Sequence, residues 1–186
     1  MVELLVSPQS QLAPEIECQI LSFLRISWPE GFQDENRLRN WITRLDHHPL
    51  SFVLVENGLL IAHAQVVWKM LDHVGVKYKT YGITGVFTYP SFRRQGYGLQ
   101  VVQAASTYIA QSDADIGMLH CEPQLKAFYG QAGWLLMEGA VTLIGARANP
   151  VISGELMMMQ FFSEKGQRGE ESFLKVPVFF DEASTW

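Results

Sequence analysis

The chain has 186 residues, of which 48% are hydrophobic, and a formal net charge of −5. This length and composition predict a single domain, residues 1–186, with a sizeable core. The negative charge argues against a nucleic-acid partner and favours cationic substrates. Cys18 and Cys121 are too few for a disulfide framework, which indicates a reducing compartment.

Targeting and membrane signals are not recognisable in the sequence. Residues 1–5 lack the basic start of a signal peptide, and no apolar run approaches the roughly 20 residues that cross a bilayer. The spacing of the histidines suggests no metal site. We therefore expect a cytoplasmic protein, monomeric or homodimeric, without a membrane partner.

The first third of the chain predicts one strand and two helices. Residues 2–6 read as a strand, and Pro14 opens a helix that ends before Pro29. Its apolar face carries Ile16, Ile20, Phe23 and Leu24. A second apolar stripe, which predicts a second helix, is formed by Leu38, Trp41, Ile42 and Leu45. The polar stretch 30–36 between the two helices is expected to face the substrate.

Two hairpins follow, the first turning at Asn57-Gly58 and the second within residues 72–75. Downstream, the patterns predict a helix over 99–110, a strand over 118–122 and a short helix over 123–132. The remaining strands are expected from Trp134 and over 140–145, 155–162 and 173–180, with a polar turn at 163–171. The fold class is α/β: a mixed, mostly antiparallel sheet of about seven strands, flanked by about four helices, with one parallel crossover.

The most informative segment is a glycine-rich turn between an apolar run ending at Thr88 and the helix from Leu99. The turn reads Arg93-Arg94-Gln95-Gly96-Tyr97-Gly98. A strand, a glycine turn and a helix together present unpaired backbone N–H groups and the positive end of a helix dipole to an anion. The two arginines add charge-assisted contacts. The ligand should therefore carry a pyrophosphate.

Two common phosphate-binding fingerprints do not fit this turn. The dinucleotide pattern needs a third glycine, and the triphosphate loop needs a Gly-Lys-Ser/Thr ending. The pattern Arg-x-x-Gly-x-Gly, which begins at Arg93 after Thr88-Tyr89-Pro90, instead resembles the signature of the GCN5-related N-acetyltransferases (GNAT). In that family it holds the pyrophosphate of acetyl-CoA. The resemblance implies the GNAT fold, with acetyl-CoA as cofactor and a small-molecule amine as substrate.

A second segment carries the same resemblance. Residues 125–134 are similar to the family's closing helix, in which a tyrosine precedes a Gly-Phe pair, and Tyr129 and Gly133-Trp134 hold these places. The resemblance implies that Tyr129 protonates the departing CoA thiolate. It also implies that the preceding strand, through the main chain of Val86, Phe87 and Thr88, binds the pantetheine arm.

Within the family, the likeness points to the aminoglycoside 2′-N-acetyltransferases. It rests on the run Leu60–Ala64, on Trp134 and on the terminal Trp186. In that group a glutamate associated with base chemistry stands where this chain has Thr84, and threonine is a poor base. Thr84 and Trp186 are expected to contact the substrate.

Several candidates remain for the group that accepts the proton of the substrate amine. An amine with a pKa near 10 must lose a proton before it attacks a thioester. Glu122 and His120, two residues apart, would share one face of a strand, and a water chain, or no dedicated base at all, could replace both. A competing function is a non-catalytic acyl-CoA-binding or regulatory module, which the threonine at position 84 favours.

Overall fold

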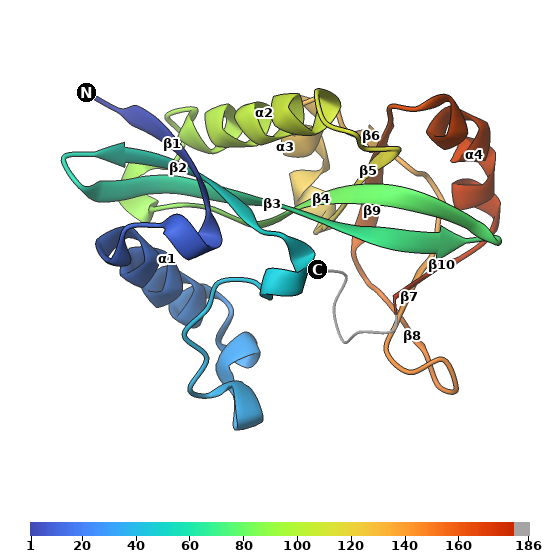
Figure 1. The fold of residues 1–186 in the computed structure, drawn as a ribbon, viewed down its shortest axis with the longest axis horizontal. Coiled ribbons are helices and arrows are strands. Elements are labelled where there is room, and N and C mark those ends of the chain that lie inside the picture. The colour runs from blue at the N-terminus through green and yellow to red at the C-terminus, as the bar shows by residue number, and fades with distance from the viewer. Residues whose placement is uncertain (181–186) are drawn as a thin grey trace. The chain divides into compact units, whose positions relative to one another are not determined.

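The computed structural model describes residues 1–180, and its elements follow one another as in Figure 1. The α-helices are α1 (Pro14–Ser27), α2 (Tyr97–Ala110), α3 (Lys126–Gly130) and α4 (Glu164–Lys175). The strands are β1 (Glu3–Pro8), β2 (Leu50–Glu56), β3 (Leu59–His73), β4 (Val76–Thr88), β5 (Ile116–Cys121), β6 (Leu135–Leu136), β7 (Thr142–Ile144), β8 (Val151–Ile152), β9 (Leu156–Phe161) and β10 (Val178–Phe180). Short 3-10 turns are η1 (Gln9–Gln11), η2 (Pro29–Phe32), η3 (Asp34–Asn36), η4 (Leu45–His47), η5 (Pro90–Phe92) and η6 (Pro123–Leu125).

Seven strands share one hydrogen-bonded sheet in the order β1-β2-β3-β4-β5-β9-β6, and a smaller sheet has the order β10-β7-β8. The pairs β1–β2, β2–β3, β5–β9 and β6–β9 are antiparallel. The pair β4–β5 is parallel, over three residue pairs from Thr80 to Gly82. The predicted mixed, mostly antiparallel sheet with one parallel crossover is confirmed for the seven-stranded sheet, and in the small sheet β10 and β7 also pair in parallel. None of the helices within residues 1–180 is long and apolar enough to cross a membrane.

The backbone contacts divide the chain into two compact units. Unit 1 comprises Met1–Val67 and Thr84–Ala105, and unit 2 comprises Trp68–Ile83 and the chain from Ser106 onward. The strands β3 and β4 and the helix α2 each continue from one unit into the other.

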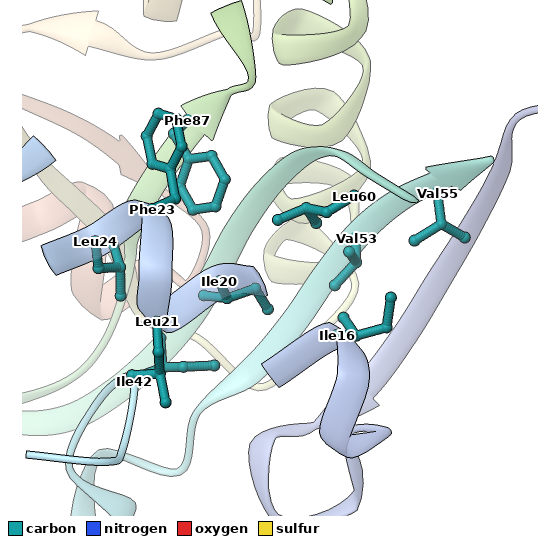
Figure 2. Packing of buried hydrophobic residues seen from close by; sticks show 10 residues of the cluster. All are labelled: Ile16, Ile20, Leu21, Phe23, Leu24, Ile42, Val53, Val55, Leu60 and Phe87. Atoms are coloured by element: carbon teal, nitrogen blue, oxygen red, sulfur yellow. The ribbon is translucent and has the colours of Figure 1, made fainter. Parts of the chain in front are cut away.

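The core of unit 1 is built on α1. Proline at its first position and two glutamates in its first turn suit a helix N-terminus. Its buried side chains lie against β2, β3 and the end of β4 (Figure 2), where Phe23 stacks on Phe87 at 4.1 Å between ring centroids. This confirms the predicted first helix and its apolar face. The core of unit 2 joins β5 and β9 methionines to Phe173 and Phe180.

The predicted second helix, on the stripe from Leu38 to Leu45, is wrong. Leu38 is 82% exposed, and of the stripe only Ile42 is buried. The Arg39 guanidinium donates to the carbonyls of Gly31, Trp41 and Ile42 and stacks on two aromatic rings, those of Phe32 and Trp41. These carbonyls are thus satisfied by a side chain, and the segment folds as short turns.

The polar turn predicted over 163–171 is also wrong, because these residues form most of α4. Ser163 caps this helix and accepts a hydrogen bond from Gly166 N at 3.0 Å. The strand predicted over 173–180 is limited to β10, since Phe173 belongs to the helix.

Candidate functional site

The glycine-rich turn in unit 1 has the backbone that an anion site requires. Arg94 and Gly96 both have positive φ, 61° and 85°, and α2 begins directly afterwards at Tyr97. Gln100 N donates to Gly96 O at 2.9 Å, which closes the first helical turn. Alternating backbone conformations of this kind gather N–H groups into a concavity that accepts oxyanions. A Cβ built on Gly96 would meet no atom within 4 Å, so the turn is open to a ligand.

The side chains of the turn agree with this chemistry. Arg93, Arg94 and Gln95 are exposed. Arg93 Nε donates to Thr88 O at 3.0 Å, and Gln95 Nε2 donates to Ser91 O at 3.1 Å. The first contact ties the turn to the end of β4, and the second ties it to η5. The donor set, backbone N–H groups beside two guanidinium groups, fits a pyrophosphate.

The end of β4 departs from a regular strand. Gly85 has a φ of 58°, and its carbonyl lies 2.7 Å from His63 Nδ1. A positive φ within a strand changes the direction of the backbone, and glycine adopts it readily. Thr84 and Val86 on either side are half-buried, whereas Phe87 is buried in the core of unit 1. The predicted pantetheine-binding segment, Val86–Thr88, therefore directly follows a glycine with positive φ.

Tyr129 lies on α3 in unit 2 and is only 7% exposed. Burial, then the nearby Cys121 and Glu155, raises the pKa of its phenol. Within residues 1–180 its hydroxyl makes no hydrogen bond, and its ring lies edge-on to Phe128. The phenol is therefore a protonated donor without an acceptor among residues 1–180.

His120 and Glu122 have different surroundings. His120 Nε2 lies 2.8 Å from Thr142 Oγ1, its ring is edge-on to Phe180, and its buried Nδ1 has no partner among the described residues. Burial, followed by the charge of Lys69, lowers its pKa to about 4, so it is neutral at pH 7. Glu122 is exposed and accepts a hydrogen bond from Gln124 Nε2.

Glu155 is a candidate residue that the sequence patterns did not reveal. The antiparallel register pairs Cys121 with Leu156, so Glu122 and Glu155 follow on neighbouring strands just beyond the last pair. Desolvation and the charge of Glu122 raise the pKa of Glu155. Two carboxylates in this relation favour proton uptake by one of them. Their pairing depends on a register that no local pattern encodes.

Trp186, the second residue expected to contact the substrate, lies outside the described residues. The two cysteines at positions 18 and 121 are both free.

Comparison with known proteins places the chain in a family. Residues 15–134 match the model of the Acetyltransferase (GNAT) family. No curated protein matches the sequence.

Solved structures resemble the fold at low sequence identity. Escherichia coli ElaA is 15% identical with a TM-score of 0.61, and an acyl-CoA N-acyltransferase from Pseudomonas aeruginosa is 16% identical with a TM-score of 0.59. Each match covers 86% of this chain and 99% of the other. A conserved protein of Enterococcus faecalis V583 is 18% identical with a TM-score of 0.55 over 75% of this chain, which spans only 33% of that longer protein.

Proposed function

This chain belongs to the acetyltransferase (GNAT) family of acyl-CoA-dependent enzymes, and we propose that it transfers an acetyl group from acetyl-CoA to a small primary amine. The observation that carries the proposal is the open turn Arg93–Gly98, which follows β4 and includes the first two residues of α2, within the segment that the family model matches. Its backbone N–H groups and arginines suit the pyrophosphate of the donor. The donor's pantetheine arm is assigned to the main chain of Val86, Phe87 and Thr88.

The reaction needs a proton acceptor and a proton donor. A carboxylate at the Glu122–Glu155 strand ends takes a proton from the substrate ammonium, and desolvation followed by the charge of Glu122 makes Glu155 the more basic choice by raising its pKa. The free amine attacks the thioester carbon, a C–N bond forms and the C–S bond breaks. Tyr129 gives its proton to the departing thiolate, and the second proton lost by the attacking nitrogen, carried by water, restores the Tyr129 phenol. His120, neutral at pH 7, and a water relay are the alternative acceptors.

The substrate is proposed to be a small cationic amine. The net charge of −5 favours approach of a cation, although this effect is not specific to one amine. Aminoglycosides are one class to test, on the resemblance carried by Leu60–Ala64 and Trp134. Thr84 and the terminal Trp186 are the proposed substrate contacts. We also propose a cytoplasmic location, supported by the two free cysteines.

The test replaces the open glycine of the turn. Gly96→Asp introduces a carboxylate where phosphate oxygens are expected, and repulsion should lower acetyl-CoA affinity by at least about 100-fold in calorimetry. Gly75→Asp is the matched control, because Gly75 also has a positive φ, 73°, and open space around its Cβ. This control has the same charge change and similar backbone strain at a hairpin turn.

Thiol release with a panel of amines then tests the transfer. We expect turnover with at least one cationic primary amine. Equal acetyl-CoA affinity in the two aspartate variants, both folded, would contradict the pyrophosphate assignment. Tight binding of acetyl-CoA without turnover on any amine would contradict the proposed transfer and support a binding module instead.

A further inference from the structure

A chain of polar side chains runs through the core of unit 1. Its members Gln9, Ser51, His63 and Gln65 are all buried, on η1, β2 and β3. Gln65 Nε2 lies 2.9 Å from Ser51 Oγ and 3.2 Å from Gln9 Oε1. His63 lies 3.4 Å from Ser51 Oγ through Nε2 and 2.7 Å from Gly85 O through Nδ1. This series of hydrogen bonds thus ends at the backbone of β4.

The donors and acceptors fix the direction of these bonds. The two hydrogens of Gln65 Nε2 serve Gln9 and Ser51, so the Ser51 hydroxyl is left to donate to His63 Nε2. His63 then carries its hydrogen on Nδ1 and donates it to the Gly85 carbonyl, which can only accept. Burial lowers the pKa of His63 to about 4, so this neutral tautomer persists at pH 7.

The other end of this hydrogen-bonded series of side chains, at Gln9, is also anchored. Gln9 Nε2 donates to Thr43 O, and Gln9 Oε1 accepts from Thr43 N, each at 2.8 Å. The C=O and N–H groups of Thr43 therefore both hold the Gln9 side chain in place. An imidazole supported in this way has little freedom to rotate, so the bond to Gly85 has a defined direction.

The bond to Gly85 determines the orientation of the next peptide group. In a trans peptide the carbonyl and the following N–H point in opposite directions, and no peptide bond among the described residues is cis. Because the Gly85 carbonyl turns toward the buried imidazole, the Val86 N–H points away from it. The φ of 58° at Gly85 allows this turn, and only glycine adopts it without strain.

We propose that His63 is a positioning residue for acetyl transfer, which holds the Gly85–Val86 peptide so that the Val86 N–H donates to the thioester oxygen of the donor. The inference rests on the proposed function, in which Val86 belongs to the donor-binding segment. A preset N–H stabilises the negative charge that develops on that oxygen in the transition state. His63 acts through the backbone and does not touch the substrate.

Two isosteric variants separate the two nitrogens of His63. In His63→Asn the amide nitrogen takes the place of Nδ1, so the bond to Gly85 is retained. In His63→Gln the longer side chain reaches the place of Nε2, so the bond to Ser51 is retained and that to Gly85 is lost. We expect kcat of the asparagine variant within about threefold of wild type, and kcat of the glutamine variant lower by about 10-fold or more with little change in KM.

Thr80→Val is the control for a general loss of core polarity. It removes another buried hydroxyl, that of Thr80, which donates to Tyr78 O at 3.3 Å and has no assigned role, so we expect kcat near the wild-type value. If the glutamine variant does not fold, Gly85→Ala moves the same peptide from the other side, because its Cβ would lie 3.4 Å from His63 Cε1 at a positive φ. It should show the same loss of kcat.

Amide hydrogen exchange at Val86 gives a readout that needs no turnover. We expect faster exchange in His63→Gln than in wild type, and an unchanged rate in His63→Asn. If the wild-type protein acetylates no amine but this exchange pattern holds, the proposed function fails and the positioning of the peptide stands. Equal kcat and equal Val86 exchange in the two His63 variants would overturn the inference.

Discussion

Tyr129 is the residue whose surroundings match one chemical role most closely. It is buried on α3, its hydroxyl has no hydrogen-bond partner within residues 1–180, and burial together with Cys121 and Glu155 raises its pKa. A phenol with a raised pKa remains protonated at every pH at which the enzyme folds well. Such a group can donate to a thiolate that forms only during the reaction.

Replacement of this phenol should therefore affect turnover more than binding. Tyr129→Phe removes the proton donor and keeps the ring, so we expect kcat to fall about 100-fold while acetyl-CoA affinity stays near wild type. Steady-state thiol release and calorimetry measure the two quantities.

The control is Tyr78→Phe, the same change at another buried tyrosine of unit 2 that has no assigned role. Its kcat should stay near wild type. If Tyr129→Phe turned over at the wild-type rate, Tyr129 would be a packing residue, and the thiolate would leave without it.

At the scale of elements, α4 shows how glycines that a tertiary contact requires can be mistaken for a turn signal in the sequence. Gly166 and Gly169 interrupt a polar stretch and suggest a loop, yet both lie inside the helix. A Cβ on Gly166 would lie 2.2 Å from Asp115 O, and one on Gly169 would lie 2.3 Å from Tyr78 Oη. The glycines are thus required by the close approach of α4 to its neighbours in unit 2.

This arrangement predicts an order of stability among three Gly→Ala variants in helices. Gly166→Ala meets backbone and should destabilise by about 1–3 kcal/mol or more, whereas Gly169→Ala meets the end of a side chain and should cost less. Gly130→Ala on α3 has open space and should be neutral or stabilising by about 0.5–1 kcal/mol. Urea denaturation measures the three free energies of unfolding. Equal values for Gly166→Ala and Gly130→Ala would contradict the packing of α4.

The same elements show what the sequence could predict. The hairpin at Asn57-Gly58, the helix from Pro14 and the turn Arg93–Gly98 carry their signals in consecutive residues, and the structure confirms these elements. The helix expected from Leu38 to Leu45 is absent because Arg39 binds carbonyls on both sides of itself in the chain. Glu155 escaped prediction because its place beside Glu122 depends on strand register. Signals in consecutive residues could be predicted from the sequence, whereas the strand register that places Glu155 beside Glu122 could not.

At the scale of the whole molecule, buried histidines link stability to pH in both units. Burial lowers the pKa of His63 in unit 1 and of His73 and His120 in unit 2. Each is neutral when folded and binds a proton near its usual pKa of about 6.5 when unfolded. The stability they provide is therefore fully present above that pH and is lost as the pH falls below it, toward about 4 for His63 and His120.

We expect the free energy of unfolding to decrease between pH 7 and pH 5, with a slope that approaches about 1.4 kcal/mol per pH unit for each such histidine. Glu155 opposes this trend, because its raised pKa makes the folded state bind a proton more readily.

His73 stacks on Phe173 at 4.2 Å and has no assigned role in the reaction, so His73→Gln can be used to remove one contribution. The variant should be less stable at pH 7 but lose less stability than wild type on going to pH 5. Urea denaturation at the two pH values measures this difference, and a pH dependence identical to that of wild type would show that His73 does not contribute to it.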